Sequence, residues 1–460
     1  MNILLINPPA NDILDPIGMQ RRKPEKTWVP LGIAYLGSTL SQAGYDVTVR
    51  DMHSYAWDNV KSELENVKPD VIGISCFTMW RAGAIQTAKL ARQCCPEAHI
   101  ILGGPHASLF PEQMFRLAPV DTIVIGEGEI TMVELAGVLA KGGDRAGVKG
   151  IAYQEAGRIV KTDPRPTVKD LESLPFPLYE SFDLDEYKSP EIPPPYLSLK
   201  GTHIISSRGC PFSCRFCSVN RFWGKQWRPR SPRNVVDELQ WLYQAHGVRH
   251  VYFSDDIFTL DQDRTVEICR EILRRKLEMV WMAETRVDCV TREMLTWMRK
   301  AGCYRIYYGV ESGSPTILKN VKKGFTVQKI KEAFAATHEA GIQPCCFLMV
   351  GNPGENETTI DETVALIKEI RPATVPIMGL TQILPGSALY EFSKSQGLIT
   401  DDFWLGNKQA PFYTGEHTVN ELIALQLRLT RGVAPELYQM LRSIGLDENY
   451  LRMRSLFGEK

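Results

Sequence analysis

The chain has 460 residues, of which 44% are hydrophobic and 23% are charged, and these proportions are ordinary for a soluble globular protein. This length exceeds a single hydrophobic core, so we expect two domains and an appendage. The 53 basic residues nearly balance the 54 acidic ones, which argues against a dedicated nucleic-acid-binding protein.

The chain starts with a short apolar run, Met1–Pro9, that has no basic region before it and ends at prolines. This pattern predicts a buried strand rather than a signal peptide. No apolar run approaches the length needed to cross a bilayer. The 11 cysteines indicate a reducing compartment, so we expect a cytoplasmic protein.

From residue 1 to residue 141, short apolar runs alternate with helical stretches, which predicts an α/β domain with a doubly wound parallel sheet. The expected helices include Leu36–Ala43 and Ala82–Cys94. The expected strands are Ile3–Ile6, Val47–Val49, Val71–Ile74, Ile100–Leu102 and Thr122–Ile125.

Polar and glycine-rich turns follow these strands. Ligands on doubly wound sheets bind beyond the carboxyl ends of the strands, so the turns are candidate ligand contacts. No G-x-G-x-x-G follows the first strand, which argues against a dinucleotide site. The candidate contacts are Ser75, Thr78, Gly103, Gly104, Pro105, His106, Gly126, Glu127 and Gly128.

Residues 142–199 are rich in proline, including Pro193–Pro195, and are predicted to be a semi-rigid linker. Residues 200–389 show six strand and helix units, fewer than the eight that close a TIM barrel, which predicts an open partial barrel. Residues 390–460 are predicted to be helical. The expected barrel strands are Thr202–Ser206, His250–Phe253, Val280–Ala283, Arg305–Val310, Pro344–Val350 and Val375–Ile383.

Three cysteines, Cys210, Cys214 and Cys217, follow the first expected barrel strand with C-x-x-x-C-x-x-C spacing. A 4Fe-4S cluster normally takes four Cys ligands, so a triad leaves one iron open to a substrate or cofactor. A zinc site would use paired C-x-x-C units or distant His residues, and neither pattern completes itself here. Chance proximity is the other alternative, but Gly209 and Pro211 flank Cys210 and let the backbone pass close to a bulky inorganic group.

The triad resembles the signature of the radical S-adenosylmethionine superfamily. The resemblance implies that the amino and carboxylate groups of S-adenosylmethionine chelate the fourth iron. It also implies that one electron from the cluster cleaves the sulfonium to give a 5′-deoxyadenosyl radical, while the protein orients the cofactor and excludes water.

The resemblance further implies S-adenosylmethionine contacts at the strand ends. Asp255 and Asp256 end the second strand, where the family binds the methionine amino group. Arg286 ends the third strand and would pair with the methionine carboxylate, and Glu311 ends the fourth strand and would hold ribose hydroxyls. Adenine would lie near a turn after the fifth strand and an aromatic residue of the cysteine motif, with contacts at Gly351, Pro353 and Phe216.

The turns of the N-terminal region resemble those of the cobalamin-binding domain that precedes many radical S-adenosylmethionine barrels. A flat corrin must approach the backbone closely, which glycine permits. Ordinary tight turns of a Rossmann-like sheet are the alternative. The first turn has Asn7–Pro9 where many cobalamin proteins have D-x-H-x-x-G, and His53 follows the second strand without that glycine. The resemblance therefore implies cobalamin without a protein His ligand, with Leu31 and Gly32 as candidates for that face of the cobalt.

From Lys200 to Arg233 there are eight Lys or Arg residues and no Asp or Glu. Such a stretch offsets the negative charge of a cluster or docks an acidic electron donor such as flavodoxin or ferredoxin, although an ordinary solvated face gives the same pattern.

These features predict a cobalamin-dependent radical S-adenosylmethionine enzyme, most simply a methylase of an unactivated carbon in a small-molecule or lipid-like substrate. Two alternatives stay open: a radical cyclase or ring-rearranging enzyme that uses cobalamin without methyl transfer, and a non-catalytic module that binds cluster and corrin. We expect a monomer that binds no nucleic acid. Residues expected to line the barrel are Trp281, Met282, Tyr307 and Tyr308.

Overall fold

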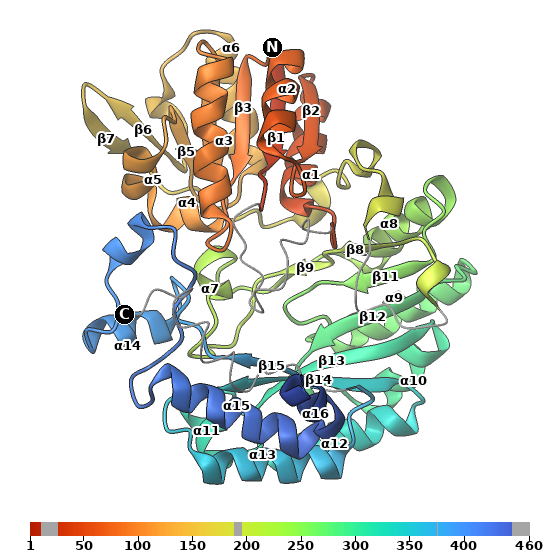
Figure 1. Ribbon diagram of the computed structural model, residues 1–460. Coiled ribbons are helices and arrows are strands. Elements are labelled where there is room, and N and C mark those ends of the chain that lie inside the picture. The colour runs from red at the N-terminus through yellow and green to blue at the C-terminus, as the bar shows by residue number, and fades with distance from the viewer. Residues whose placement is uncertain (11–25, 188–195, 375, 444–460) are drawn as a thin grey trace. The chain divides into compact units, whose positions relative to one another are not determined.

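The computed structural model describes residues 1–10, 26–187, 196–374 and 376–443, and these form two compact units. The first unit contains the described residues up to Thr202 together with Asp401–Asn407. The second contains His203–Thr400 and the described residues from Lys408 onward. Each unit is built on one main sheet with flanking helices (Figure 1).

The first unit has a seven-stranded sheet in the order β2-β1-β3-β4-β5-β6-β7. β1 pairs in parallel with β2 and β3, and parallel pairing continues through β4 and β5. The predicted doubly wound sheet is therefore confirmed. The strands are β1 (Asn2–Asn7), β2 (Asp46–Asp51), β3 (Val71–Ser75), β4 (His99–Gly103), β5 (Thr122–Val124), β6 (Ile151–Glu155) and β7 (Arg158–Lys161).

Helices pack in pairs against this sheet, with α1 beside α6 and α2 beside α3. Leu4, Ile6 and Ile72 of the sheet join Leu64 of α2 and Ala88 of α3 in one buried cluster. Ile3 and Leu5, on the opposite face of β1, are also buried, so both faces of the sheet are covered. The helices are α1 (Leu31–Gln42), α2 (Trp57–Val67), α3 (Arg81–Cys94), α4 (Pro105–Leu109), α5 (Pro111–Leu117) and α6 (Glu129–Ala140).

The predicted linker at residues 142–199 is wrong, because its described part belongs to the first unit. β6 pairs antiparallel with β5 and β7 pairs with β6, so the stretch extends the sheet. Ala156 and Gly157 join the two strands with φ angles of 48° and 76°, which suits a tight hairpin turn. The apolar runs on either side of this turn, Ile151–Tyr153 and Ile159–Val160, outweigh the prolines that suggested a linker. Pro193–Pro195 lies outside the described residues.

The stretch after the hairpin also packs onto the first unit. The backbone N–H of Leu178 donates to the carbonyl of Ala34 at 3.1 Å, and Tyr179 is fully buried. The hydroxyl of Tyr187 donates to Oδ2 of Asp51 at 2.8 Å. These contacts fix the segment in place.

The second unit has a six-stranded sheet in the order β15-β14-β13-β12-β11-β8, and adjacent strands from β11 to β15 pair in parallel. The predicted six-stranded partial barrel is confirmed. The strands are β8 (Gly201–Ile204), β11 (His250–Phe253), β12 (Val280–Thr285), β13 (Cys303–Glu311), β14 (Gln343–Val350) and β15 (Ile377–Leu380).

Helices separate the strands of this sheet as the sequence period predicts. Ser231 is the N-cap of α8, where its hydroxyl accepts a hydrogen bond from the backbone of Asn234 at 3.2 Å and Pro232 takes the first helical position. The helices are α8 (Pro232–Ala245), α9 (Gln262–Arg274), α10 (Arg292–Lys300), α11 (Pro315–Asn320), α12 (Val327–Glu339) and α13 (Glu357–Ile370).

The described part of the C-terminal region is largely helical, with α14 (Ala388–Ser395), α15 (Val419–Val433) and α16 (Pro435–Ser443). α15 packs on α13 and β15 of the barrel. Asp401–Asn407 departs from the predicted domain division because it belongs to the first unit. Among the described residues, no helix has the length and apolar character required to cross a membrane.

Candidate active site

A short antiparallel ribbon closes the base of the cysteine loop. β9 (Ser207–Arg208), which follows β8, pairs with β10 (Arg228–Pro229), so the chain between them forms a loop that begins at Gly209. Gly209 has a φ of +92°, and a Cβ at this position would lie 2.3 Å from the carbonyl oxygen of Gln226. Only glycine fits this approach of the two backbones, which explains the glycine before the first cysteine.

The loop carries the three predicted cysteines as partly exposed free thiols. The backbone N–H of Cys217 donates to the carbonyl of Cys214 at 3.2 Å. Burial raises the pKa of Cys210 and raises that of Cys217 to about 11, and the neighbouring thiols and Asp256 add to both shifts. Without metal these two thiols stay protonated at neutral pH, and bound iron would displace their protons.

The donor set of the loop fits an iron–sulfur cluster. Within residues 1–10, 26–187, 196–374 and 376–443, no group of three or more His, Cys, Asp or Glu side chains is arranged to hold a single metal ion. A four-iron cluster does not require that arrangement, since its Cys ligands bind separate irons. Three free thiols on one loop are the ligand set expected for a four-iron cluster and not the set expected for a zinc site.

Two adjacent carboxylates end β11, and they differ in what they contact. The carboxylate of Asp255 is buried and accepts hydrogen bonds from the backbone of Ser206 at 2.8 Å and from the hydroxyls of Ser206 and Ser207 at 2.7 and 2.5 Å. Burial raises the pKa of Asp255 even though Arg264 and these bonds oppose the shift. Asp255 therefore ties the ends of two strands together, and its predicted contact with the methionine amino group stays a prediction.

Asp256 has no such set of side-chain hydrogen bonds among the described residues. Burial and then the charge of Asp255 raise the pKa of Asp256 to about 7, while a hydrogen bond from the backbone of Gly209 lowers it. Asp256 in turn raises the pKa of Cys210 and Cys217, which places it near the thiols. The predicted contact of Asp256 with the methionine amino group also stays a prediction.

Arg286, after β12, lies against the cysteine loop. Its Nε and Nη2 donate to the carboxylate of Asp288 at 2.9 and 2.8 Å, and Nη2 also donates to the carbonyl of Lys323 at 2.6 Å. Nη1 faces Sγ of Cys214 at 3.9 Å. Burial lowers the pKa of Arg286, but Asp288 outweighs burial and holds that pKa above its usual value. The predicted pairing of Arg286 with the methionine carboxylate has to compete with Asp288, which already takes two of the three nitrogens.

Glu311 ends β13 as predicted and forms an ion pair that the sequence did not reveal. Its Oε1 lies 3.0 Å from Nζ of Lys323, and both side chains are almost completely buried. Glu311 has a φ of +66°, which is rare for a residue with a side chain, and it follows a register shift in β13. Backbone strain of this kind clusters at functional sites. Nζ of Lys323 also lies 5.8 Å from the ring centroid of Phe216, so the ion pair and the predicted adenine contact are neighbours.

The turn after β14 is stabilised by hydrogen bonds from its own backbone to the buried carboxylate of Glu355. Oε2 of Glu355 accepts hydrogen bonds from the backbone of Gly351 at 2.6 Å and of Asn352 at 3.0 Å. Burial raises the pKa of Glu355 to about 7, and these two bonds oppose the shift. The carbonyl of Pro353 accepts a hydrogen bond from the side chain of Asn320 at 2.8 Å. The predicted contacts Gly351 and Pro353 therefore lie on a rigid turn.

The four residues expected to line the barrel divide into two groups. Trp281 donates to the carbonyl of Ala301, after α10, and Tyr308 hydrogen-bonds Thr337 of α12, so both are directed toward the helices. This corrects the expectation for Trp281 and Tyr308. Tyr307 instead stacks on Phe347 of β14, with ring centroids 5.3 Å apart. Met282 is fully buried and accepts a weak hydrogen bond from Tyr304.

In the first unit, the predicted turns after β3 and β4 bond to each other. The backbone of Cys76, next to Ser75, donates to the carbonyl of Gly103 at 2.7 Å, and the backbone of His106 donates to the carbonyl of Cys76 at 3.0 Å. Gly104 has a φ of +98°, and a Cβ there would lie 3.1 Å from the carbonyl oxygen of Cys76. Gly103 is followed directly by this glycine, and Pro105 opens α4. The sheet order brings these turns to one edge, as a ligand-binding sheet requires.

The side chain of His106 does not face an open surface. It is fully buried, with Nδ1 3.2 Å from Oγ1 of Thr78 and its ring in contact with Phe110 and Trp404. Burial and then the charge of Arg81 lower the pKa of His106 to about 3, so the ring is neutral. Thr78 and His106 therefore bond to each other and hold the turn, and their predicted contact with cobalamin stays a prediction.

The turn after β5 contains Gly126, which has open space beside it, and Glu127, whose side chain bonds to the protein backbone. Gly126 has a φ of +82°, and a Cβ there would meet nothing within 4 Å. Oε2 of Glu127 accepts a hydrogen bond from the backbone of Val168 at 2.6 Å, so this carboxylate holds the fold, and its predicted cobalamin contact stays a prediction. Gly128 precedes α6, and a Cβ there would lie 3.0 Å from Leu36. The open space at Gly126 would let a ligand approach the backbone of this turn.

The structure also describes the region of the expected cobalt face. His53 packs edge-on against Trp80, and burial lowers its pKa, which agrees with a packing histidine. A Cβ at Gly32 would meet nothing within 4 Å, and Leu31 is buried. Phe77 and Met79, after β3, are exposed by 43% and 39%. These two apolar residues were not among the predicted ligand contacts, although their place in a strand-end turn was a usable signal.

The basic stretch from Lys200 to Arg233 is only partly exposed on the surface. Arg208, Arg228 and Arg230 are almost completely buried. Arg230 forms a buried ion pair with Glu238 at 2.5 Å. These three residues hold the cysteine loop and the start of α8, so the predicted donor-docking face is reduced to the exposed remainder of the stretch, which includes Arg221, Lys225 and Arg233.

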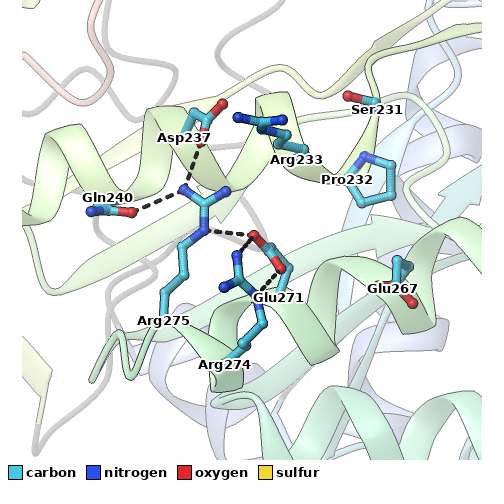
Figure 2. A pocket seen from close by; sticks show the side chains of 9 residues that line it. All are labelled: Ser231, Pro232, Arg233, Asp237, Gln240, Glu267, Glu271, Arg274 and Arg275. Carbon is cyan, nitrogen blue, oxygen red and sulfur yellow. Dashed lines mark hydrogen bonds and ion pairs between the residues drawn. The ribbon is translucent and has the colours of Figure 1, made fainter.

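A separate cavity of about 690 Å³ lies on the outer side of α8 and α9, and Figure 2 shows the residues that line it. Arg275 donates to Asp237 at 2.6 Å and to Glu271 at 2.7 Å, and Arg274 also pairs with Glu271. These four charges form a surface ion-pair network on α8 and α9.

A parallel half-barrel with a three-cysteine loop after its first strand, joined to a doubly wound domain with open glycine turns, defines a radical S-adenosylmethionine enzyme with a second cofactor domain. The model of the radical SAM superfamily matches residues 204–367, and the model of the B12 binding domain matches residues 21–136. The chain belongs to the family of cobalamin-binding radical S-adenosylmethionine enzymes. The predicted family and fold class are confirmed.

Individual relatives extend over most of the chain. An uncharacterized methyltransferase of Pyrococcus horikoshii, PH0819, is 31% identical over 88% of this chain and 85% of its own length. An anaerobic magnesium-protoporphyrin IX monomethyl ester cyclase of Rubrivivax gelatinosus is 31% identical over 75% of this chain and 63% of its own length. The solved structure of TsrM, a radical S-adenosylmethionine methyltransferase of Kitasatospora setae, has a similar fold, with a TM-score of 0.69, 20% identity, and coverage of 86% of this chain and 75% of that one.

Proposed function

We propose that this protein is a cobalamin-dependent radical S-adenosylmethionine methylase that acts on an unactivated carbon of a small-molecule or lipid-like substrate. The observation that carries the proposal is the presence, in one chain, of a three-thiol loop on a half-barrel and a cobalamin-binding domain. A relative that bears the methyltransferase name matches 88% of the chain, including both domains. When bound, the cluster and S-adenosylmethionine would supply a carbon-centred radical, and cobalamin would supply a methyl group.

In the second unit, the protein's part is to hold and orient S-adenosylmethionine. Cys210, Cys214 and Cys217 would bind three irons and leave the fourth for the cofactor. Asp256 lies near the thiols and suits the cationic amino group. Glu311 is fixed by its bond to Lys323 and would accept hydrogen bonds from the ribose hydroxyls.

The adenine would lie among rigid groups of the same unit. Phe216 lies near the buried Lys323, and the Gly351 and Pro353 turn is held by Glu355 and Asn320. Because these partners are already fixed without ligand, binding costs little side-chain entropy.

In the first unit, the proposed cobalamin contacts are mainly backbone. Ser75, Gly103, Gly104 and Pro105 lie on turns that bond to each other, and Gly126 leaves open space. The ring of His106 is buried and neutral and holds this edge from below the turn. We propose that no histidine of the chain ligates the cobalt. The absorption and EPR spectra of bound cob(II)alamin test this, because a nitrogen ligand splits the EPR lines.

Product analysis tests the reaction. With its substrate, the reconstituted protein is expected to form 5′-deoxyadenosine and S-adenosylhomocysteine in about equal amounts, since one S-adenosylmethionine gives the radical and one the methyl group. 5′-Deoxyadenosine alone, with a product of unchanged carbon count, would reject methyl transfer.

A radical cyclase is the second candidate, and a specific observation favours it. The cyclase of Rubrivivax gelatinosus is as identical to this chain, at 31%, as the methyltransferase relative is. Product mass separates the two, because only methylation adds a carbon.

The exposed basic residues Arg221, Lys225 and Arg233 are the proposed contact for an acidic electron donor such as flavodoxin or ferredoxin.

A further inference from the structure

We propose that Arg286 sets the reduction potential of the cluster through a hydrogen bond to Cys214, and that Asp288 restrains this effect. The inference rests on the cluster of the proposed function and not on methyl transfer. Nη1 of Arg286 lies 3.9 Å from Sγ of Cys214, within the range of a hydrogen bond to sulfur. The side chain of Arg286 is 5% exposed, so the contact is made away from bulk water.

The guanidinium is fixed on every side except the one that faces sulfur. Asp288 holds Nε and Nη2, and the carbonyl of Lys323 takes a second bond from Nη2. The guanidinium carbon lies 3.5 Å from the ring centroid of Phe212, which is itself in the cysteine loop between two ligands. The ring of Phe325 lies at 5.1 Å. An arginine held in this way is pre-organised, so its hydrogen bond to Cys214 loses little conformational entropy when the thiolate binds iron.

The sign of the effect follows from charge. Reduction adds one electron to the cluster, and a cation or hydrogen bond at a ligand sulfur stabilises the more negative, reduced state. Burial strengthens this interaction because the local dielectric constant is low. Asp288 lies on the opposite side of the guanidinium and partly cancels its charge. Loss of the Arg286 charge should therefore lower the potential, and loss of the Asp288 charge should raise it.

The competing role for Arg286 is the one that the sequence resemblance implied, a contact with the methionine carboxylate. In that role Arg286 would change the affinity for S-adenosylmethionine and would leave the potential of the cluster alone unchanged. The two roles are separated by measuring the potential before S-adenosylmethionine is added.

The experiment is a dye-mediated redox titration of the full-length reconstituted protein, followed by the EPR signal of the reduced cluster without S-adenosylmethionine. For Arg286→Gln we expect at least a tenfold lower ratio of reduced to oxidised cluster at fixed potential, which is about 59 mV for one electron. Arg286→Lys keeps the charge and should show a smaller loss, and Asp288→Asn should shift the ratio in the opposite direction. Arg270→Gln, at an exposed position on α9, is the matched control and should leave the ratio unchanged.

Iron and sulfide content is measured for each variant, so that a change in potential is not confused with poor assembly. Should Arg286→Gln fail to assemble a cluster, Asp288→Asn carries the test through the opposite sign of its shift. An unchanged potential in Arg286→Gln, or shifts of the same sign in the Arg286 and Asp288 variants, would overturn the proposal while leaving the proposed function intact. Wild-type protein that holds no cluster would overturn both.

Discussion

The strand ends of the two sheets present different chemistry. In the second unit they carry charged side chains in ion pairs, such as the buried pair of Glu311 with Lys323 and the pair of buried Arg286 with partly exposed Asp288. In the first unit the charged and titratable side chains of the turns are directed into the protein, as with Glu127 and His106, and glycine backbone is left at the edge.

This difference matches the two expected ligands. S-adenosylmethionine is small and carries amino, carboxylate, sulfonium and hydroxyl groups, so oriented side chains recognise it. A corrin is broad and flat, so close backbone approach matters more than any one side chain. Cofactor binding in each unit should therefore be sensitive to a different kind of substitution. In the second unit the sensitive change is the removal of a functional group, and in the first it is the addition of a methyl group.

The largest expected effect separates the two cofactors. Cys214→Ala removes one of three cluster ligands and should abolish the cluster absorption, because two thiolates do not hold the cube. Uptake of hydroxocobalamin should persist, since the turns of the first unit contain no residue of the loop. Absorption spectra after anaerobic reconstitution check both. Cys94→Ala, at a free cysteine of the first unit, is the control and should keep both cofactors.

The next largest effect is on stability, and it tests the buried ion pair of Glu311 with Lys323. Glu311→Gln leaves Lys323 charged and buried without its carboxylate, which should lower the free energy of unfolding by about 3–5 kcal/mol. The double variant Glu311→Gln, Lys323→Met should recover most of this loss, because an apolar replacement removes the unpaired charge. Denaturant unfolding measures both. Equal destabilisation in the single and double variants would show that the pair is not coupled.

Much of the fold and the position of the cysteine loop were predictable, for reasons that individual residues make clear. Strands such as His250–Phe253 are short, mostly apolar and followed by polar residues, so their ends and the residues after them could be placed from sequence. The Cys210, Cys214 and Cys217 spacing is local, so it was visible as well. The hairpin at Ala156 and Gly157 was missed because prolines farther on dominated the interpretation of that stretch.

Side-chain partners were the part that sequence could not give. Asp255 and Asp256 are adjacent and chemically identical, yet only the fold brings Ser206 and Ser207 to the first of them. Lys323 is separated from Glu311 by a helix, so their pairing has no local signal. Trp404 likewise reaches His106 across almost 300 residues of sequence, and contacts of this kind depend on tertiary structure.

A smaller effect sharpens the comparison in the first unit. Gly103→Ala adds a Cβ whose nearest neighbour is Val124 at 3.8 Å, and Gly103 has no positive φ, so the free protein should keep its stability to within about 0.5 kcal/mol. A corrin that lies on this backbone would be displaced, and we expect at least tenfold weaker cobalamin binding in an absorbance titration. Unchanged affinity would mean that the ligand does not approach Gly103.

The smallest effect concerns pH. The pKa of Glu355 is raised in the folded protein, from 4.5 to about 7, so folding favours its protonated form. Its contribution to stability is therefore fully present below pH 4.5 and is lost as the pH rises through about 7. Glu355→Gln should flatten the decline in unfolding free energy between pH 5 and about 8, as followed by denaturant titrations at several pH values. Parallel pH profiles for wild type and variant would show that Glu355 is not the group responsible.

The most direct test of the central claim is the reductive cleavage of S-adenosylmethionine by the reconstituted protein, measured as 5′-deoxyadenosine by mass spectrometry. We predict that the wild-type protein with cluster, cobalamin and a low-potential reductant forms 5′-deoxyadenosine, and that Cys214→Ala forms none. Wild-type protein with a complete cluster that leaves S-adenosylmethionine intact would contradict the assignment of the loop as a radical-generating centre.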